Sequence, residues 1–153
     1  MSGEHPADRP MDSGPLRGPV SDAERHAQGM RTRREVLGDA HVDRAEARKD
    51  DFTADFQDMI TRYAWGEIWS RPGLDRRTRS CITLTAMVAG GHLDELAMHV
   101  RAAVRNGLTY EEIKEVLLQT AIYCGVPAAN SAFAVAQRVL GELERPAGVT
   151  GVE

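Results

Sequence analysis

Signals for the start and end of helices recur along the chain, and they limit the folds that this sequence can adopt more than any other feature does. Ser21 with Glu24, and Thr109 with Glu112, have the spacing of capping boxes, in which each side chain satisfies a free backbone amide at a helix start. Asn106-Gly107 is typical of a helix end. No convincing strand remains between such signals. The sequence therefore predicts an all-α fold, a compact bundle of about six helices joined by short loops.

Hydrophobic spacing places the remaining helices. Five large apolar residues between positions 52 and 63 fall on one helical face. Cys81–Ala89 is almost wholly apolar, so the helix capped by Asp75 should be central, and the alternation within it would also suit a strand. Residues 65–74 read as a turn rich in large side chains. The predicted helices cover about 21–37, a segment holding 52–63, 75–89, 93–105, 109 to the break at 125, and 127–144.

The two ends differ in composition from the middle. Residues 1–20 hold four of the seven prolines, three glycines and no aromatic residue, so they bury too little apolar surface to offset the entropy of ordering. Residues 145–153 have a similar character. We therefore expect a disordered extension over 1–20, one helical domain over 21–144 and a disordered tail over 145–153.

Charge and cysteine usage exclude several classes of protein. The 19 basic and 23 acidic residues are interleaved along the chain, whereas nucleic-acid binding needs basic residues clustered on one face. Nucleic-acid binding is therefore disfavoured. No stretch approaches the ~20 apolar residues of a membrane helix, and no signal peptide is visible, so we expect a cytoplasmic protein without membrane or nucleic-acid partners. Cys81 and Cys124 lack a CxxC partner, and each is more typical of a small buried hydrophobe than of a nucleophile.

Three residues at spacings of three and four, His92, Glu95 and His99, would share one face of a continuous helix. Two histidines and a carboxylate could bind a metal, whereas a solvated helix start is the plainer interpretation, and His92 follows Gly90-Gly91 and can lie outside the helix. We predict no metal and no cofactor. His99 sits among apolar residues and is the better candidate for proton exchange, although a structural histidine with satisfied hydrogen bonds is the alternative.

The turn between the second and third helices concentrates unusual side chains. Trp65 and Trp69 either join two helices or line a pocket in which Glu67 and Arg71 make polar contacts, and both interpretations stay open. Arg79 is the arginine nearest the apolar run of the next helix, so we expect it to turn inward.

Several stretches together resemble one family. The most specific are WGEIWSRPGL (65–74) and AIYCGVPAAN (121–130). They are joined by DRRTRS (75–80), ELAMHVR (95–101), and NGLT with EEIKEVL (106–117). Over roughly 31–143 the chain resembles the γ-carboxymuconolactone decarboxylase family, and its helix-histidine-helix pattern is similar to that of the wider alkylhydroperoxidase-D-like superfamily.

The resemblance implies an alkylhydroperoxidase-D-like fold and a homo-oligomer, commonly a hexamer. It also implies cofactor-independent decarboxylation of 4-carboxymuconolactone, a lactone dicarboxylate, to 3-oxoadipate enol-lactone in protocatechuate breakdown by the β-ketoadipate pathway. For that reaction we expect a dry cavity that touches His99 and the tryptophan turn. The expected roles are proton transfer by His99 with Glu95 or Glu67, carboxylate binding by Arg71 and Arg79, and apolar walls from Trp69 and Tyr123.

Two alternatives remain. Peroxidase members of the superfamily carry a CxxC pair before the histidine, but aligning that histidine with His99 places His92 and Glu95 at the cysteine positions, which disfavours thiol redox chemistry. The second alternative is a non-catalytic helical oligomer that binds a small ligand.

Overall fold

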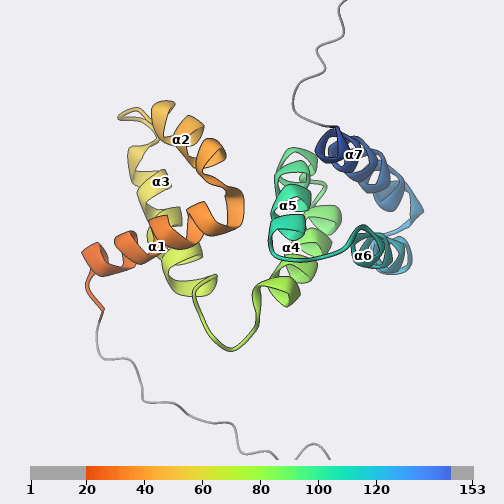
Figure 1. Cartoon of the computed structure of the whole chain (residues 1–153), viewed down its shortest axis with the longest axis horizontal. Helices are drawn as coiled ribbons and strands as arrows, with labels where there is room; N and C mark the ends of the chain where they lie inside the picture. The colour runs from red at the N-terminus through yellow and green to blue at the C-terminus, as the bar shows by residue number, and fades with distance from the viewer. Residues whose placement is uncertain (1–19, 146–153) are drawn as a thin grey trace, which may run out of the picture.

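Every regular element of the described residues is a helix, which confirms the all-α prediction. The computed structural model describes residues 20–145, so the predicted disordered ends lie outside the described residues except for Val20 and Arg145. The chain forms seven α-helices and one π-helix (Figure 1). In order they are α1 (Asp22–Leu37), α2 (Asp39–Ala47), α3 (Ala54–Ile60), η2 (Thr61–Ile68), α4 (Arg76–Gly90), α5 (Leu93–Arg105), α6 (Tyr110–Tyr123) and α7 (Val126–Glu144).

The predicted caps form as expected. Complete capping boxes open α1 at Ser21 and α6 at Thr109. The Asp75 carboxylate accepts a hydrogen bond from the Thr78 backbone N–H at 2.7 Å and so starts α4. Because these signals are local, α1, α5 and α6 begin and end within a residue or two of their predicted bounds.

Between Gly38 and Leu74 the prediction was partly wrong. Residues 39–47 form a separate short helix, α2, that hydrophobic spacing did not predict. The tryptophan turn begins only at Trp69, because η2 continues through Ile68 as a π-helix in which the Trp69 N–H bonds the Ala64 carbonyl five residues earlier. Trp65 is thus a buried helical residue rather than part of a loop.

Two glycines explain how closely η2 packs against α1. A Cβ added at Gly29 would lie 1.9 Å from the Thr61 carbonyl oxygen, and one added at Gly66 would lie 2.2 Å from the Arg25 carbonyl oxygen. Any side chain at either position would force the two helices apart. The crossing therefore depends on glycine on both helices, and it fixes where η2 presents its tryptophans.

The helices form two groups, α1 to η2 and α4 to α7, with a connection around residues 69–75 (Figure 1). Helix α5 joins the groups, since it packs against α1 as well as α4, α6 and α7. The prediction that the apolar helix α4 is central was therefore wrong. Leu84 and Val88 of α4 are buried in the larger core, but Ile82 on its other face is 54% exposed.

Several large apolar side chains remain outside both cores. Four of the residues predicted to share a face near 52–63 are exposed, including Phe52 at 94%. A second exposed set, Ile122, Tyr123 and Val126, lies where α6 gives way to α7. Among residues 20–145, no helix combines the length and apolar character required to cross a bilayer.

Candidate active site

His99, at the middle of α5, packs against the two tryptophans. Its ring is stacked against Trp69, with centroids 6.2 Å apart, and against Trp65, with centroids 6.5 Å apart. The two indoles are themselves stacked at 5.4 Å. The π-helix η2 therefore delivers both aromatic rings to one imidazole, which is nine-tenths buried.

Burial makes this imidazole unusual electrostatically. It lowers the pKa of His99 from 6.5 to about 4, while nearby Glu95 raises that pKa and His41 on α2 lowers it. At neutral pH the ring is therefore uncharged. Its Nδ1 atom is buried and has no hydrogen-bond partner among the described residues. The alternative, a structural histidine, requires hydrogen bonds to both ring nitrogens, and the described residues supply none to Nδ1.

The predicted acidic partners lie on two different elements. Glu95 is in the first turn of α5, one turn before His99, and is exposed. Glu67 is on η2, where its carboxylate lies 3.4 Å from Arg71 Nη1 and 3.7 Å from Arg25 Nε. Glu95 therefore acts directly on the charge of His99, whereas Glu67 is held in a cluster of arginines.

Of the two predicted carboxylate-binding arginines, Arg71 lies in the turn that follows η2 and Arg79 lies near the start of α4. Arg71 is exposed and faces Glu67. Arg79 Nη2 donates a hydrogen bond to the Arg71 carbonyl at 3.2 Å, and its Nε atom is buried without a partner among the described residues. Arg79 is half-buried and bonds back to the turn, so its role in binding a carboxylate stays a prediction. This hydrogen bond brings Arg79 to the backbone of Arg71, two residues after Trp69.

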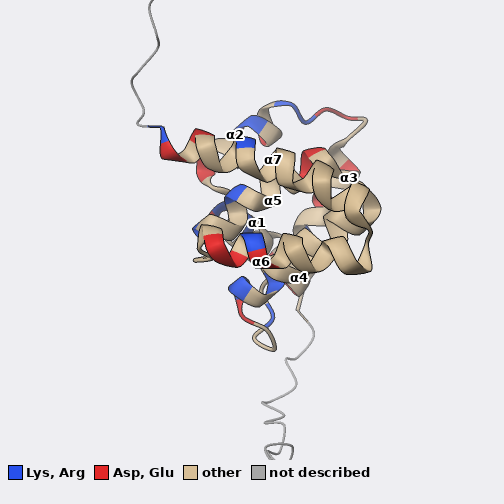
Figure 2. Cartoon of the chain, turned by 90° about the vertical axis from the view of Figure 1, so that its right-hand side faces the viewer, with Lys and Arg blue, Asp and Glu red and all other residues tan. Residues whose placement is uncertain are grey.

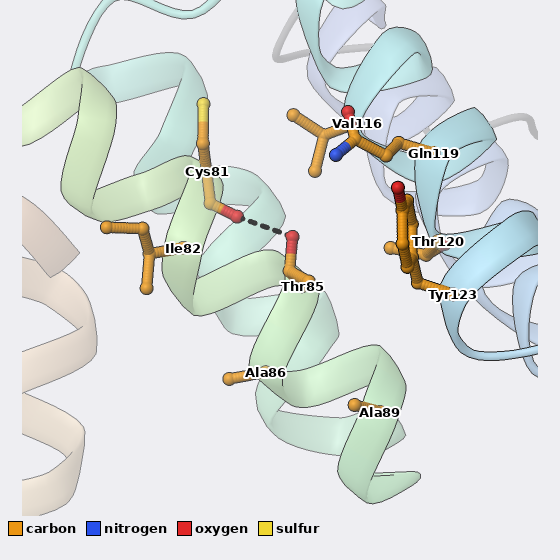
Figure 3. A pocket seen from close by; sticks show the side chains of 9 residues that line it. All are labelled: Cys81, Ile82, Thr85, Ala86, Ala89, Val116, Gln119, Thr120 and Tyr123. Atoms are coloured by element: carbon orange, nitrogen blue, oxygen red, sulfur yellow. Dashed lines mark hydrogen bonds between the residues drawn. The ribbon is translucent and has the colours of Figure 1, made fainter.

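Tyr123 lies elsewhere, in the wall of a cavity of about 570 Å³ between α4 and α6 (Figure 3). Cys81, Ile82 and Thr85 face it from α4, and no side chain in its wall is charged. The predicted cavity touching both His99 and the tryptophan turn does not occur among the four cavities described within residues 20–145. Both indoles stack against the imidazole, and Trp69 is the less buried of the two.

The possible metal ligands do not converge. His92 caps α5 from outside the helix, and its ring lies over Gly90. No group of three His, Cys, Asp or Glu side chains within residues 20–145 is arranged to hold a metal ion. Cys81 and Cys124 are both free thiols, and burial raises the pKa of Cys81 above its ordinary value.

Two contributors to the cluster were not assigned from the sequence. Trp65 is the more buried of the two stacked indoles, and His41 lies near enough to influence the His99 charge. The four-residue spacing of Trp65 and Trp69 was visible, but nothing in the sequence indicates that α5 faces them. His41 carries no motif at all.

Known decarboxylases are similar to this chain over most of its length. The pattern of the carboxymuconolactone decarboxylase family matches residues 54–138. A 4-carboxymuconolactone decarboxylase of Acinetobacter baylyi is 48% identical over 124 residues, covering 81% of this chain and 92% of that protein. A nitrosuccinic acid decarboxylase of Metarhizium robertsii is 40% identical over 125 residues, covering 78% of this chain and 87% of that protein. By this family pattern and these two similarities, the chain belongs to the carboxymuconolactone decarboxylase family.

Proposed function

We propose that this chain is a carboxy-lyase that converts 4-carboxymuconolactone to 3-oxoadipate enol-lactone without a cofactor. The observation that carries the proposal is the imidazole of His99, buried against two stacked tryptophans with an unpartnered Nδ1, in a chain that is 48% identical to a 4-carboxymuconolactone decarboxylase. A buried polar atom without a partner is unfavourable unless a ligand satisfies it.

The substrate supplies its own electron sink. Its ring carboxylate is vinylogous to the lactone carbonyl, so loss of CO₂ moves the electron pair of the broken C–C bond through the ring double bond onto the carbonyl oxygen. The resulting dienolate then takes one proton at the ring carbon next to the carbonyl. The protein must bind the dianion, stabilise the oxyanion and deliver that proton.

The residues at the tryptophan turn suit these tasks. Displacement of the partly exposed Trp69 would open His99 to the substrate, and the indoles would form an apolar wall that weakens solvation of the departing carboxylate. Arg71 and Arg79, beside Trp69, would bind carboxylates. Tyr123 lines another cavity, so any contact with this substrate would be made from there or by a neighbouring subunit.

Proton delivery depends on the electrostatics of His99. A bound dianion opposes the effect of burial and raises the imidazole pKa, so that the ring takes up a proton in the complex. The imidazolium then protonates the dienolate. Solvent returns a proton to the imidazole by a route along the exposed Glu95. Glu67 would orient Arg71 rather than exchange protons.

A homo-oligomer, in keeping with the hexamers of the family, and a cytoplasmic location are part of this proposal. The exposed residues Phe52, Ile122 and Tyr123 provide apolar surface that a second copy would cover. No charged residue lies between Glu115 and Arg138, and the face of α6 and α7 in Figure 2 carries long uncharged stretches.

Turnover of enzymatically generated carboxymuconolactone, followed by its ultraviolet absorbance, tests the proposal. We expect His99→Gln to lower kcat by ~10²–10⁴-fold, because glutamine keeps a hydrogen-bonding amide but cannot transfer the proton. His92→Gln, which changes an exposed histidine just before α5, is the matched control and should keep wild-type turnover. Wild-type kcat in a correctly assembled His99→Gln protein would refute the role.

The same assay separates the alternatives. A Cys81→Ser, Cys124→Ser double variant should retain turnover, whereas a thiol oxidoreductase would lose its activity. Binding of the lactone without release of CO₂ would instead indicate a non-catalytic protein. Nitrosuccinate is a second candidate substrate because of the 40% identity to a nitrosuccinic acid decarboxylase, and a nitro group beside the carboxylate is likewise an electron sink.

A further inference from the structure

A second hollow, of about 640 Å³, lies between the start of α2 and one face of α5. Arg44 enters it from α2, and Arg101 and Arg105 enter it from successive turns of α5. None of the residues given the active-site roles above lines it. This arginine hollow is therefore a feature separate from the tryptophan turn.

The arginines of the hollow are only partly neutralised. Arg101 pairs with Glu142, but Arg44 and Arg105 have no carboxylate within ion-pair distance among residues 20–145. The wall also holds two aspartates, Asp94 and Asp39, and Asp39 shares Arg34 with Asp43. The lining itself, with three arginines and two aspartates, carries a net positive charge.

The start of α2 adds to this positive character. Its N-cap is Gly38, at φ +88°, and no side chain caps the free amides of the first turn. The Arg105 guanidinium lies over Gly38, since a Cβ added there would be 3.3 Å from Arg105 Cζ. A cation beside the positive end of a helix is unfavourable, and an anion placed between them would bind both.

The hollow also has apolar walls, formed by Leu37, Met98 and Leu143. Guanidinium groups bind carboxylates through paired hydrogen bonds, while these apolar side chains suit a carbon skeleton rather than a bare inorganic ion. Burial, with positive charge from Arg33, Arg44, Arg48 and Arg101, lowers the pKa of His41 in the same wall. The site is therefore suited to an organic acid.

We propose that the arginine hollow between α2 and α5 binds a small organic dicarboxylate, with its carboxylates on Arg44, Arg105 and the first-turn amides of α2. The anion is either a separate acid or the substrate of the proposed function, on which this inference then rests; in the second case the hollow takes over carboxylate binding from Arg71 and Arg79. His41 lines the hollow and also acts on the charge of His99, so an anion bound here would lie near the reaction centre in either case.

Direct binding tests the proposal without any need for turnover. Succinate, as the probe, should shift the amide NMR signals of residues 38–41 in the wild-type protein. An Arg44→Gln, Arg105→Gln double variant should bind succinate at least ~10-fold more weakly, because two charge-assisted contacts are lost. An Arg31→Gln, Lys114→Gln variant removes the same charge from exposed positions outside the hollow and should bind as the wild type does.

Kinetics then distinguish the two sources of the anion. If it is the substrate, succinate competes with the lactone and the double variant raises KM more than it lowers kcat. If it is a separate acid, succinate changes the rate without competing, and the double variant abolishes that effect. Either pattern supports the proposal. Absence of succinate shifts at residues 38–41, or equal binding by the wild type and the double variant, would overturn it even if the lactone is turned over normally.

Discussion

Acidification should destabilise this protein through a single buried histidine. In the folded chain the pKa of His99 is lowered to about 4 by burial, whereas an unfolded chain titrates this imidazole near its ordinary 6.5. Between these two values the unfolded state binds a proton that the folded state does not. The contribution of His99 to the free energy of unfolding is therefore fully present above about pH 6.5 and decreases as the pH falls toward 4. Below pH 4 this group causes no further loss.

The size of the effect is set by the two pKa values, 6.5 and about 4. At 1.36 kcal/mol for each pH unit between them, His99 should remove ~3 kcal/mol of unfolding free energy across this window. That is a large part of the ~5–15 kcal/mol by which a typical domain is stable. A change of this size is readily measured by denaturation.

Urea unfolding of the wild type, His99→Gln and His92→Gln between pH 4 and 7.5 measures this contribution. Glutamine stays uncharged throughout, so the His99→Gln protein should show a pH dependence shallower by ~3 kcal/mol over the window. His92→Gln keeps the buried imidazole and should behave as the wild type does. Parallel pH profiles for the wild type and His99→Gln would show that His99 is not a buried neutral group and would remove the electrostatic basis of the proposed mechanism.

Two further predictions concern packing. Gly29→Ala should lower the free energy of unfolding by about 1–3 kcal/mol, because its Cβ would lie 1.9 Å from the Thr61 carbonyl oxygen. Gly141→Ala on α7, where a Cβ meets open space, should be neutral or stabilising by up to ~1 kcal/mol. Thermal denaturation of the two variants checks this, and equal melting temperatures would contradict it. Trp65→Ala removes a buried indole stacked on His99 and Trp69, so we expect a loss of about 3–5 kcal/mol in chemical denaturation, and a loss below about 1 kcal/mol would show that the indole contributes little to this core.

Local signals made much of the fold predictable. A cap such as Asp75 or Thr109 acts within one turn, so the sequence alone places the starts of α4 and α6. The identity of the central helix was not predictable in this way. Cys81–Ala89 is almost wholly apolar, yet α5 is the helix that joins the two groups, because its polar and apolar positions are divided more sharply between faces.

The candidate site was predictable in its parts but not in its arrangement. His99 and Trp69 were singled out by their residue types, and the structure stacks them. None of the described cavities touches both of them, and Tyr123 faces a cavity between α4 and α6, because side-chain direction depends on how distant helices cross. Periodicity placed Phe52 on a shared apolar face, but it does not show what covers that face, and in the structure Phe52 is exposed.

The π-helical form of η2 makes the length of this segment as important as its composition. A π-helix closes each turn with a hydrogen bond one residue longer than that of an α-helix, so η2 accommodates an extra residue within its turns. Inserting a further residue, or deleting one outside this π-helical winding, would rotate Trp69 away from the His99 imidazole even though every chemical group survived. Natural variation in this stretch should accordingly tolerate substitution far better than insertion or deletion.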